Sequence, residues 1–169
     1  MATMKRRLLL SVAGILQILL CGCPLSSTLP LGPSIDAPMD SRILGKWVFI
    51  EDAGDSKEAA VLSILPFNEH EYYAEAVERG RTTDRYRAYL TLIEGVPFLN
   101  VQEIREEPAK RTFMFVKVSV SEDALGLAVV EDTLAKEKPL TSDELRQLIR
   151  EHIENPSLYD TPMKFRKMP

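Results

Sequence analysis

The chain changes character near residue 42, where apolar and polar residues begin to alternate along short runs. In Phe113–Val120 a methionine and three valines occupy every second position, and Tyr86–Leu92 alternates in the same way. A period of two is typical of β-strands that bury one face, and turn residues separate the runs. We therefore predict seven strands, at residues 43–51, 58–66, 70–78, 84–94, 97–104, 111–120 and 125–131.

The connections between several of these runs are short. They include Asn68-Glu69, Arg79–Thr83 and Glu94-Gly95. Strands joined by so few residues lie side by side and antiparallel, because a parallel crossover needs a dozen residues or more. The order of the runs therefore predicts a meander.

The period changes to that of a helix after residue 140. Thr141-Ser-Asp-Glu144 has the form of a capping box, in which the Thr141 hydroxyl accepts a hydrogen bond from the Glu144 amide. Asn155-Pro156 ends the helical pattern, and residues 162–167 have the composition of a closing strand. One apolar stripe predicts a helix that packs over a barrel end or a sheet face. The stripe consists of Leu145, Leu148, Ile149 and Ile153.

These elements predict a mainly β fold. We expect an antiparallel meander that closes into a barrel of about eight strands, with one C-terminal α-helix before the last strand. Closure is favoured because it removes the exposed strand edges that would otherwise pair with other chains.

Residues 1–22 have the features of an export signal. Lys5, Arg6 and Arg7 precede an apolar run of 13 residues, Leu8–Leu20. A membrane-spanning helix needs about 20 apolar residues, so this run fits a secretory signal peptide better than a span.

Both cysteines of the chain, Cys21 and Cys23, follow this apolar run. A disulfide between them would be strained, because the two Cα atoms of a disulfide usually lie about 4.4–6.8 Å apart. A structural zinc site needs about four ligands, and no other cysteine is present. They could also be two small apolar residues that end the run.

Leu20-Cys21-Gly22-Cys23 resembles the lipobox, the processing signal of bacterial lipoproteins. The pattern is an apolar residue, two small residues and a cysteine. The resemblance implies cleavage before Cys23, which would carry acyl chains and anchor the protein to a bacterial membrane in the cell envelope. A cut before Cys21 would leave Leu20, a large residue, at the last place of the signal.

The following segment, Pro24–Asp40, contains four prolines together with Ser, Thr and Gly. Such a composition buries little apolar surface and stays extended. We therefore expect three parts: a signal peptide at 1–22, a lipid-anchored tether at 23–40, and a barrel domain at 41–169.

The first predicted strand contains Gly45 and Trp47, and this Gly-x-Trp pattern resembles the start of lipocalin and fatty-acid-binding barrels. In that superfamily the tryptophan plugs the base of the barrel and an arginine of the last strand packs across it. The resemblance implies this role for Arg166. The whole layout is also similar to uncharacterised bacterial lipoproteins with lipocalin-like domains.

Composition and motifs argue against several functions. A formal net charge of −4 gives no sign of nucleic-acid binding. Because the sequence lacks Gly-x-Ser-x-Gly, a Gly-rich phosphate loop and His-Glu-x-x-His, we expect neither an enzyme nor a cofactor. We expect no metal site at Glu69, His70 and Glu71, which fit a solvated turn, and His152 fits a helix boundary.

Two hypotheses for the function remain open. The barrel could hold a lipid or another small apolar ligand, or it could be a packed accessory module of the envelope with a protein partner that the sequence does not identify. The difference depends on which large side chains point inward. If Tyr86, Leu90, Phe98, Phe113 and Phe115 all do, the interior is filled.

Overall fold

The computed structural model describes residues 23–35, 37–50, 60–78, 81–104, 107–133 and 141–169. The predicted signal peptide, including Cys21, lies outside these residues, as do residues 51, 58 and 59 of two predicted strands. The described elements, in chain order, are β1 (Ser26–Ser27), a 3₁₀ helix (Ser41–Ile43), β2 (Gly45–Phe49), β3 (Val61–Pro66), β4 (Tyr72–Glu78), β5 (Arg81–Ile93), β6 (Val96–Glu103), a 3₁₀ helix (Pro108–Lys110), β7 (Phe113–Val120), β8 (Ala124–Val129), α2 (Ser142–His152), a 3₁₀ helix (Pro156–Leu158) and β9 (Met163–Lys167).

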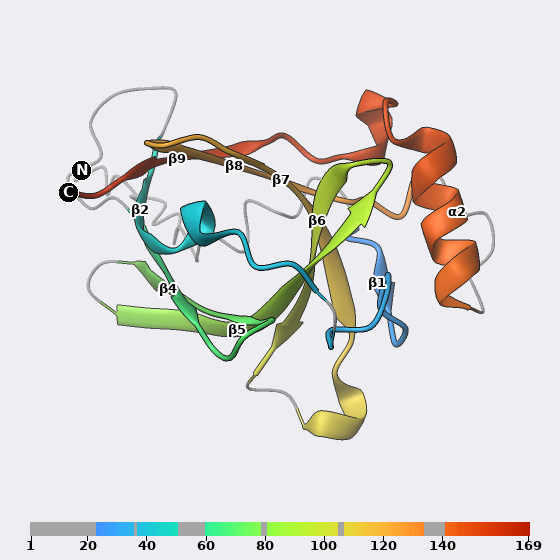
Figure 1. Ribbon diagram of the computed structural model, residues 1–169, viewed down its shortest axis with the longest axis horizontal. Coiled ribbons are helices and arrows are strands. Elements are labelled where there is room, and N and C mark those ends of the chain that lie inside the picture. Colours follow the sequence, from blue (N-terminus) through green and yellow to red (C-terminus); the bar gives the residue numbers. More distant parts are fainter. Residues whose placement is uncertain (1–22, 36, 51–59, 79–80, 105–106, 134–140) are drawn as a thin grey trace, which may run out of the picture.

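Strands β2 to β9 form a closed antiparallel barrel of eight strands, with α2 outside it (Figure 1). Each strand pairs with the next along the chain, and β9 pairs with both β8 and β2. Glu94 and Gly95, with φ of 50° and 79°, form the tight turn between β5 and β6, as in a type I′ hairpin. The predicted mainly β fold, its barrel and its late helix are confirmed, and the shape is lipocalin-like.

Closure gives every strand residue an inner or an outer side, and this creates two separate cores. The first fills part of the barrel and includes Trp47, Leu90 and Val118. The second lies outside the barrel and contains Phe98 and Phe115, both fully buried. Alternation along the strands therefore sends two of the largest side chains out of the interior.

Helix α2 covers the outer core. Its predicted capping box is present, since the Glu144 amide donates to Thr141 Oγ1 at 3.1 Å and the Thr141 amide donates to Glu144 Oε2 at 2.9 Å. Leu145 and Ile149 are fully buried in the outer core. The stripe predicted from the sequence thus packs on an outer sheet face rather than over a barrel end.

The segment predicted as a free tether is part of the folded domain, so this prediction is wrong for the described residues 24–35 and 37–40, which we call the strap. Leu25 and Leu31 are buried in the outer core, and β1 pairs with the start of β7. The composition was misleading because a few leucines suffice when the barrel already presents an apolar outer face to receive them.

Hydrogen bonds from the barrel hold the strap in place. The side-chain oxygen of Asn100, which is fully buried, accepts from the Leu31 amide at 2.7 Å, and its amide donates to Thr91 Oγ1 at 2.9 Å. The Tyr89 hydroxyl donates to the Gly32 carbonyl at 2.9 Å, and burial raises the pKa of Tyr89 to about 12. Buried polar groups of the outer face therefore find their partners in the strap.

We predict that Asn100→Ala destabilises the protein by about 1–3 kcal/mol, because the buried Leu31 amide loses its acceptor. Urea unfolding measures this loss. Gln102→Ala is a matched control, since Gln102 lies on the same strand two residues further on, is half-buried, and should change stability by about 0.5 kcal/mol or less. Equal effects of the two substitutions would contradict the role of Asn100.

Candidate functional site

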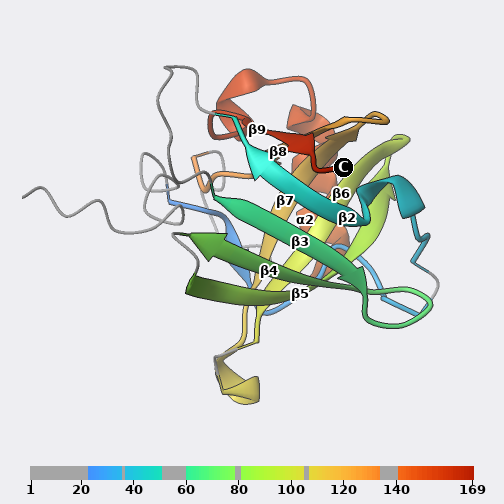
Figure 2. The same cartoon turned by 90° about the vertical axis from the view of Figure 1, so that its left-hand side faces the viewer.

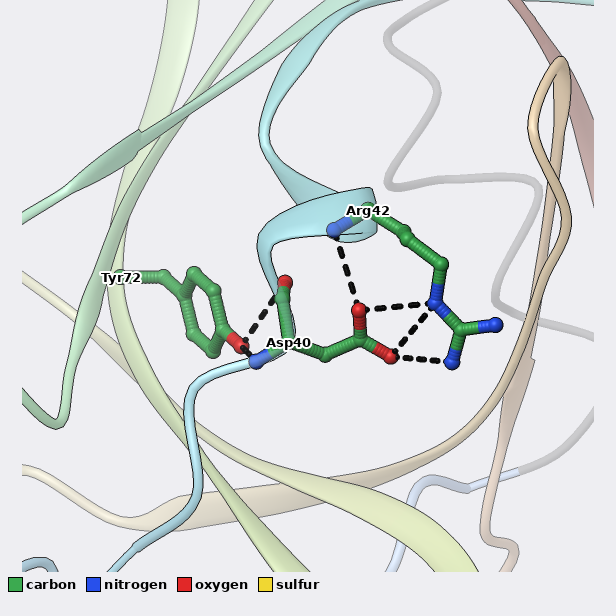
Figure 3. Close-up of polar contacts among 3 residues, drawn as sticks. All are labelled: Asp40, Arg42 and Tyr72. Carbon is green, nitrogen blue, oxygen red and sulfur yellow. Dashed lines mark hydrogen bonds and ion pairs between the residues drawn. The ribbon is translucent and has the colours of Figure 1, made fainter.

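The 3₁₀ helix Ser41–Ile43 covers one end of the barrel, which we call the base (Figure 2). Asp40 caps this helix by accepting from the Arg42 amide, and the Arg42 guanidinium binds the same carboxylate, with Nη2 to Oδ2 at 2.6 Å (Figure 3). This hydrogen bond from Arg42 lowers the pKa of Asp40. The Tyr72 hydroxyl contacts the Asp40 backbone by accepting from its amide at 2.7 Å, and burial raises the pKa of Tyr72. The strap is thus joined to the barrel wall just where it enters the base.

Trp47 plugs the base from inside. Its side chain is fully buried and its Nε1 donates to the Ile43 carbonyl at 2.9 Å. Gly45 has a φ of +131°, which disfavours other residues, and a Cβ there would lie 3.2 Å from Lys167 Cε. The structure thus gives both residues of the Gly-x-Trp pattern a structural role at the base.

The cation over Trp47 is Lys167 and not Arg166, so the position inferred from the resemblance needs correction. Lys167 Nζ lies 5.1 Å from the centroid of the Trp47 ring, whereas Arg166 is exposed. The reason is the register: Lys167 is directly opposite Trp47 and shares its inner side, and Arg166, one residue earlier, points outward.

An apolar cavity of about 140 Å³ lies in the other half of the barrel, lined by residues of strands β3 to β9. The barrel end on this side is the one at which β2, β4, β6 and β8 finish, and we call it the cavity end. Among the described lining residues, Asp84 and Tyr86 are the two whose side chains carry oxygen. Both belong to β5, so the polar atoms of the cavity come from one side of its wall.

The cavity exists because small residues face inward on this half of the barrel. Four alanines line it, at positions 60, 74, 76 and 88. Tyr86 also lines the cavity and Leu90 belongs to the inner core, but Phe98 and Phe115 lie in the outer core and Phe113 packs against it. The condition under which the interior would be filled is therefore not met.

The turn around His70 is not simply solvated. Glu71 is buried on the outer side of the barrel, where its carboxylate accepts from Arg87 Nε at 2.8 Å and from Arg87 Nη2 at 2.7 Å. The Asn68 side-chain amide donates to it at 2.6 Å, and His70 Nδ1 lies 3.0 Å from the Ala37 carbonyl. A buried carboxylate needs hydrogen-bond donors of this kind. The two hydrogen bonds from Arg87 also join the start of β4 to β5.

The pair of Glu71 and Arg87 was missed in the sequence. The available signal was an arginine on one face of the predicted strand 84–94 and a glutamate near the start of the preceding predicted strand. Their pairing depends on the strand register, which the sequence alone did not define. His152, at the end of α2, is half-buried, in line with a boundary position. In the described part of the chain, no three His, Cys, Asp or Glu side chains form a group suited to a metal ion.

Cys23, the predicted acylation site, is exposed at the first described position. Its carbonyl accepts from the Asp132 amide at 2.9 Å, and Pro24 forms a bridge with Glu131. The residue is therefore held next to the chain that continues from β8. Over the described ranges, no helix has the length and apolar character needed to cross a membrane.

Comparison with protein-family models, with curated proteins and with solved structures gives no match to this chain.

We predict that Lys167→Met destabilises the protein by about 0.5–2 kcal/mol, because it keeps the aliphatic stem but removes the cation over Trp47. Since Trp47 is the single tryptophan of the chain, its fluorescence reports both the unfolding and the local change. Arg166→Met is the matched control on the neighbouring residue and should have little effect on either signal. If Arg166→Met lowers the stability more than Lys167→Met does, Arg166 and not Lys167 is the cation that packs across Trp47.

Proposed function

We propose that this protein is a non-enzymatic, lipid-anchored protein of the bacterial cell envelope that binds a small apolar molecule in its barrel. The observation that carries the proposal is the apolar cavity at the cavity end. Its alanine-rich wall leaves space that larger inward residues would have filled. A small apolar molecule bound there would remove apolar surface of the wall from water and gain packing contacts with it.

The size of the cavity restricts the ligand. Ligand pockets for drug-sized molecules measure about 300–1,000 Å³, and this cavity measures about 140 Å³. In another protein, an engineered apolar cavity of about 150 Å³ stays dry and binds benzene or xenon. The ligand class supported best is therefore a single small ring or the end of an acyl chain, with Asp84 and Tyr86 beside its more polar part.

The lipid anchor rests on the lipobox-like sequence at Cys23. The exposed position of Cys23 is compatible with acyl chains on its thiol. Each buried methylene group contributes about 0.8 kcal/mol to membrane binding, and one chain alone anchors only marginally. The two or three chains implied by the resemblance would keep the protein on the bilayer.

The alternative is an accessory module with a packed barrel. The small size of the cavity and the buried Trp47, which packs with the inner core in the base half, favour this alternative. Ligand binding decides between the two functions.

We predict that benzene binds the protein and raises its melting temperature, because it fills an apolar space in the native state alone. Pyrimidine, a polar ring of similar size, should not. Ala74→Leu places three more carbons in the cavity and should abolish the effect of benzene. Ala128→Leu makes the same change on the outer side of β8, near Lys117 and Tyr159, and should preserve it.

The melting temperature should be measured for all three proteins with increasing benzene. If benzene stabilises none of them, the packed accessory module is correct. If it stabilises Ala74→Leu as much as the unsubstituted protein, the ligand binds elsewhere. Native mass spectrometry of the protein purified from cells then tests whether an apolar molecule co-purifies.

We predict that Cys23→Ser releases the protein from membranes, because the serine cannot carry the thioether-linked lipid. Fractionation of cells that express each form measures the release, and the mass of the mature protein reports acylation. If Cys23→Ser remains membrane-bound, the uncut leader anchors the protein instead.

A further inference from the structure

The strap begins at the cavity end and finishes at the base. Its first residues lie beside Glu131 and Asp132, beyond the end of β8, and its last residue, Asp40, contacts Tyr72 at the base. Figure 2 shows the same arrangement, with the blue start of the described chain on the left and the 3₁₀ helix of the base on the right. Cys23 therefore lies at the cavity end.

Because the strap is packed on the barrel, the domain cannot move away from Cys23 or turn about it as it could on a free tether. A free segment of 17 residues could extend over about 60 Å, which would let the domain turn in any direction above a membrane. Here the bridge from Pro24 to Glu131 and the buried Leu25 fix the chain immediately after Cys23. The Cys23 carbonyl is itself held by the Asp132 amide.

We infer that the strap orients the barrel on the membrane, with its cavity end against the bilayer surface and its base pointing away. This inference rests on the proposed acylation of Cys23. Acyl chains attached at a fixed point of one barrel end hold that end at the headgroups. The cavity then lies next to the part of the membrane in which apolar molecules concentrate, so the partner of this surface is the bilayer itself.

The orientation can be measured with a fluorophore at each end of the barrel. Thr82 is exposed at the start of β5, across the cavity end from the β8 side, and Glu122 is exposed in the turn between β7 and β8 at the base. Thr82→Cys and Glu122→Cys give single labelling sites, because the acylated Cys23 does not react. Full-length mature protein is placed in phosphatidylethanolamine–phosphatidylglycerol vesicles that carry nitroxide-labelled headgroups.

We expect quenching of the fluorophore at Thr82→Cys to be several-fold stronger than at Glu122→Cys. A Gly/Ser insertion of about ten residues between Cys23 and Pro24 adds a mean reach of about 17 Å and leaves the strap itself unchanged. This insertion should remove most of the difference between the two sites.

The outcomes separate this inference from the proposed function. A mature protein without acyl mass, or one that fails to float with vesicles, would contradict the anchor. An acylated, vesicle-bound protein with equal quenching at the two sites would overturn the orientation alone. Unequal quenching that the insertion leaves intact would show that the strap does not set it.

Discussion

The short strand β9 closes the barrel, because it pairs with β2 along one side and with β8 along the other. Strand β9 follows α2 in the sequence, and its pairing with β2 joins the two edges of the sheet. Once the sheet is closed, each residue has a fixed side: Phe165 is buried in the inner core, Arg166 points to solvent, and Lys167 lies over Trp47. A shift of the register by one residue would exchange these sides.

The fixed sides explain how the base and the cavity share one barrel. At the base, the tryptophan, its lysine and the 3₁₀ helix fill the interior, and Gly45 gives the lysine the room it needs. In the other half, four alanines stand among larger apolar side chains in the wall, which leaves about 140 Å³ open. The interior of an eight-stranded barrel is just wide enough for side chains to fill it or to leave a small space. In this barrel the base is filled and the other half keeps a small apolar space.

Much of this fold follows from local pattern in the sequence. The alternation in Phe113–Val120, the capping box at Thr141 and the late strand all report on neighbours along the chain, and they were predicted correctly. The errors concern contacts between distant residues. Lys167 was missed because the register of β9 against β2 decides which of two adjacent cations faces inward, and the strap was missed because Leu31 meets Asn100 across 69 residues of sequence.

The same alternation connects the candidate site to the strap. If Phe98 and Phe115 faced inward, they would occupy interior space and the outer face would lose its apolar surface. Because they face outward, the barrel keeps its cavity and gains an outer core, which then buries Leu25 and Leu31 of the strap. The residues that leave the interior open are therefore the residues that hold the start of the domain at the cavity end. A sequence that filled its barrel with these phenylalanines would lose the cavity and the fixed position of Cys23 together.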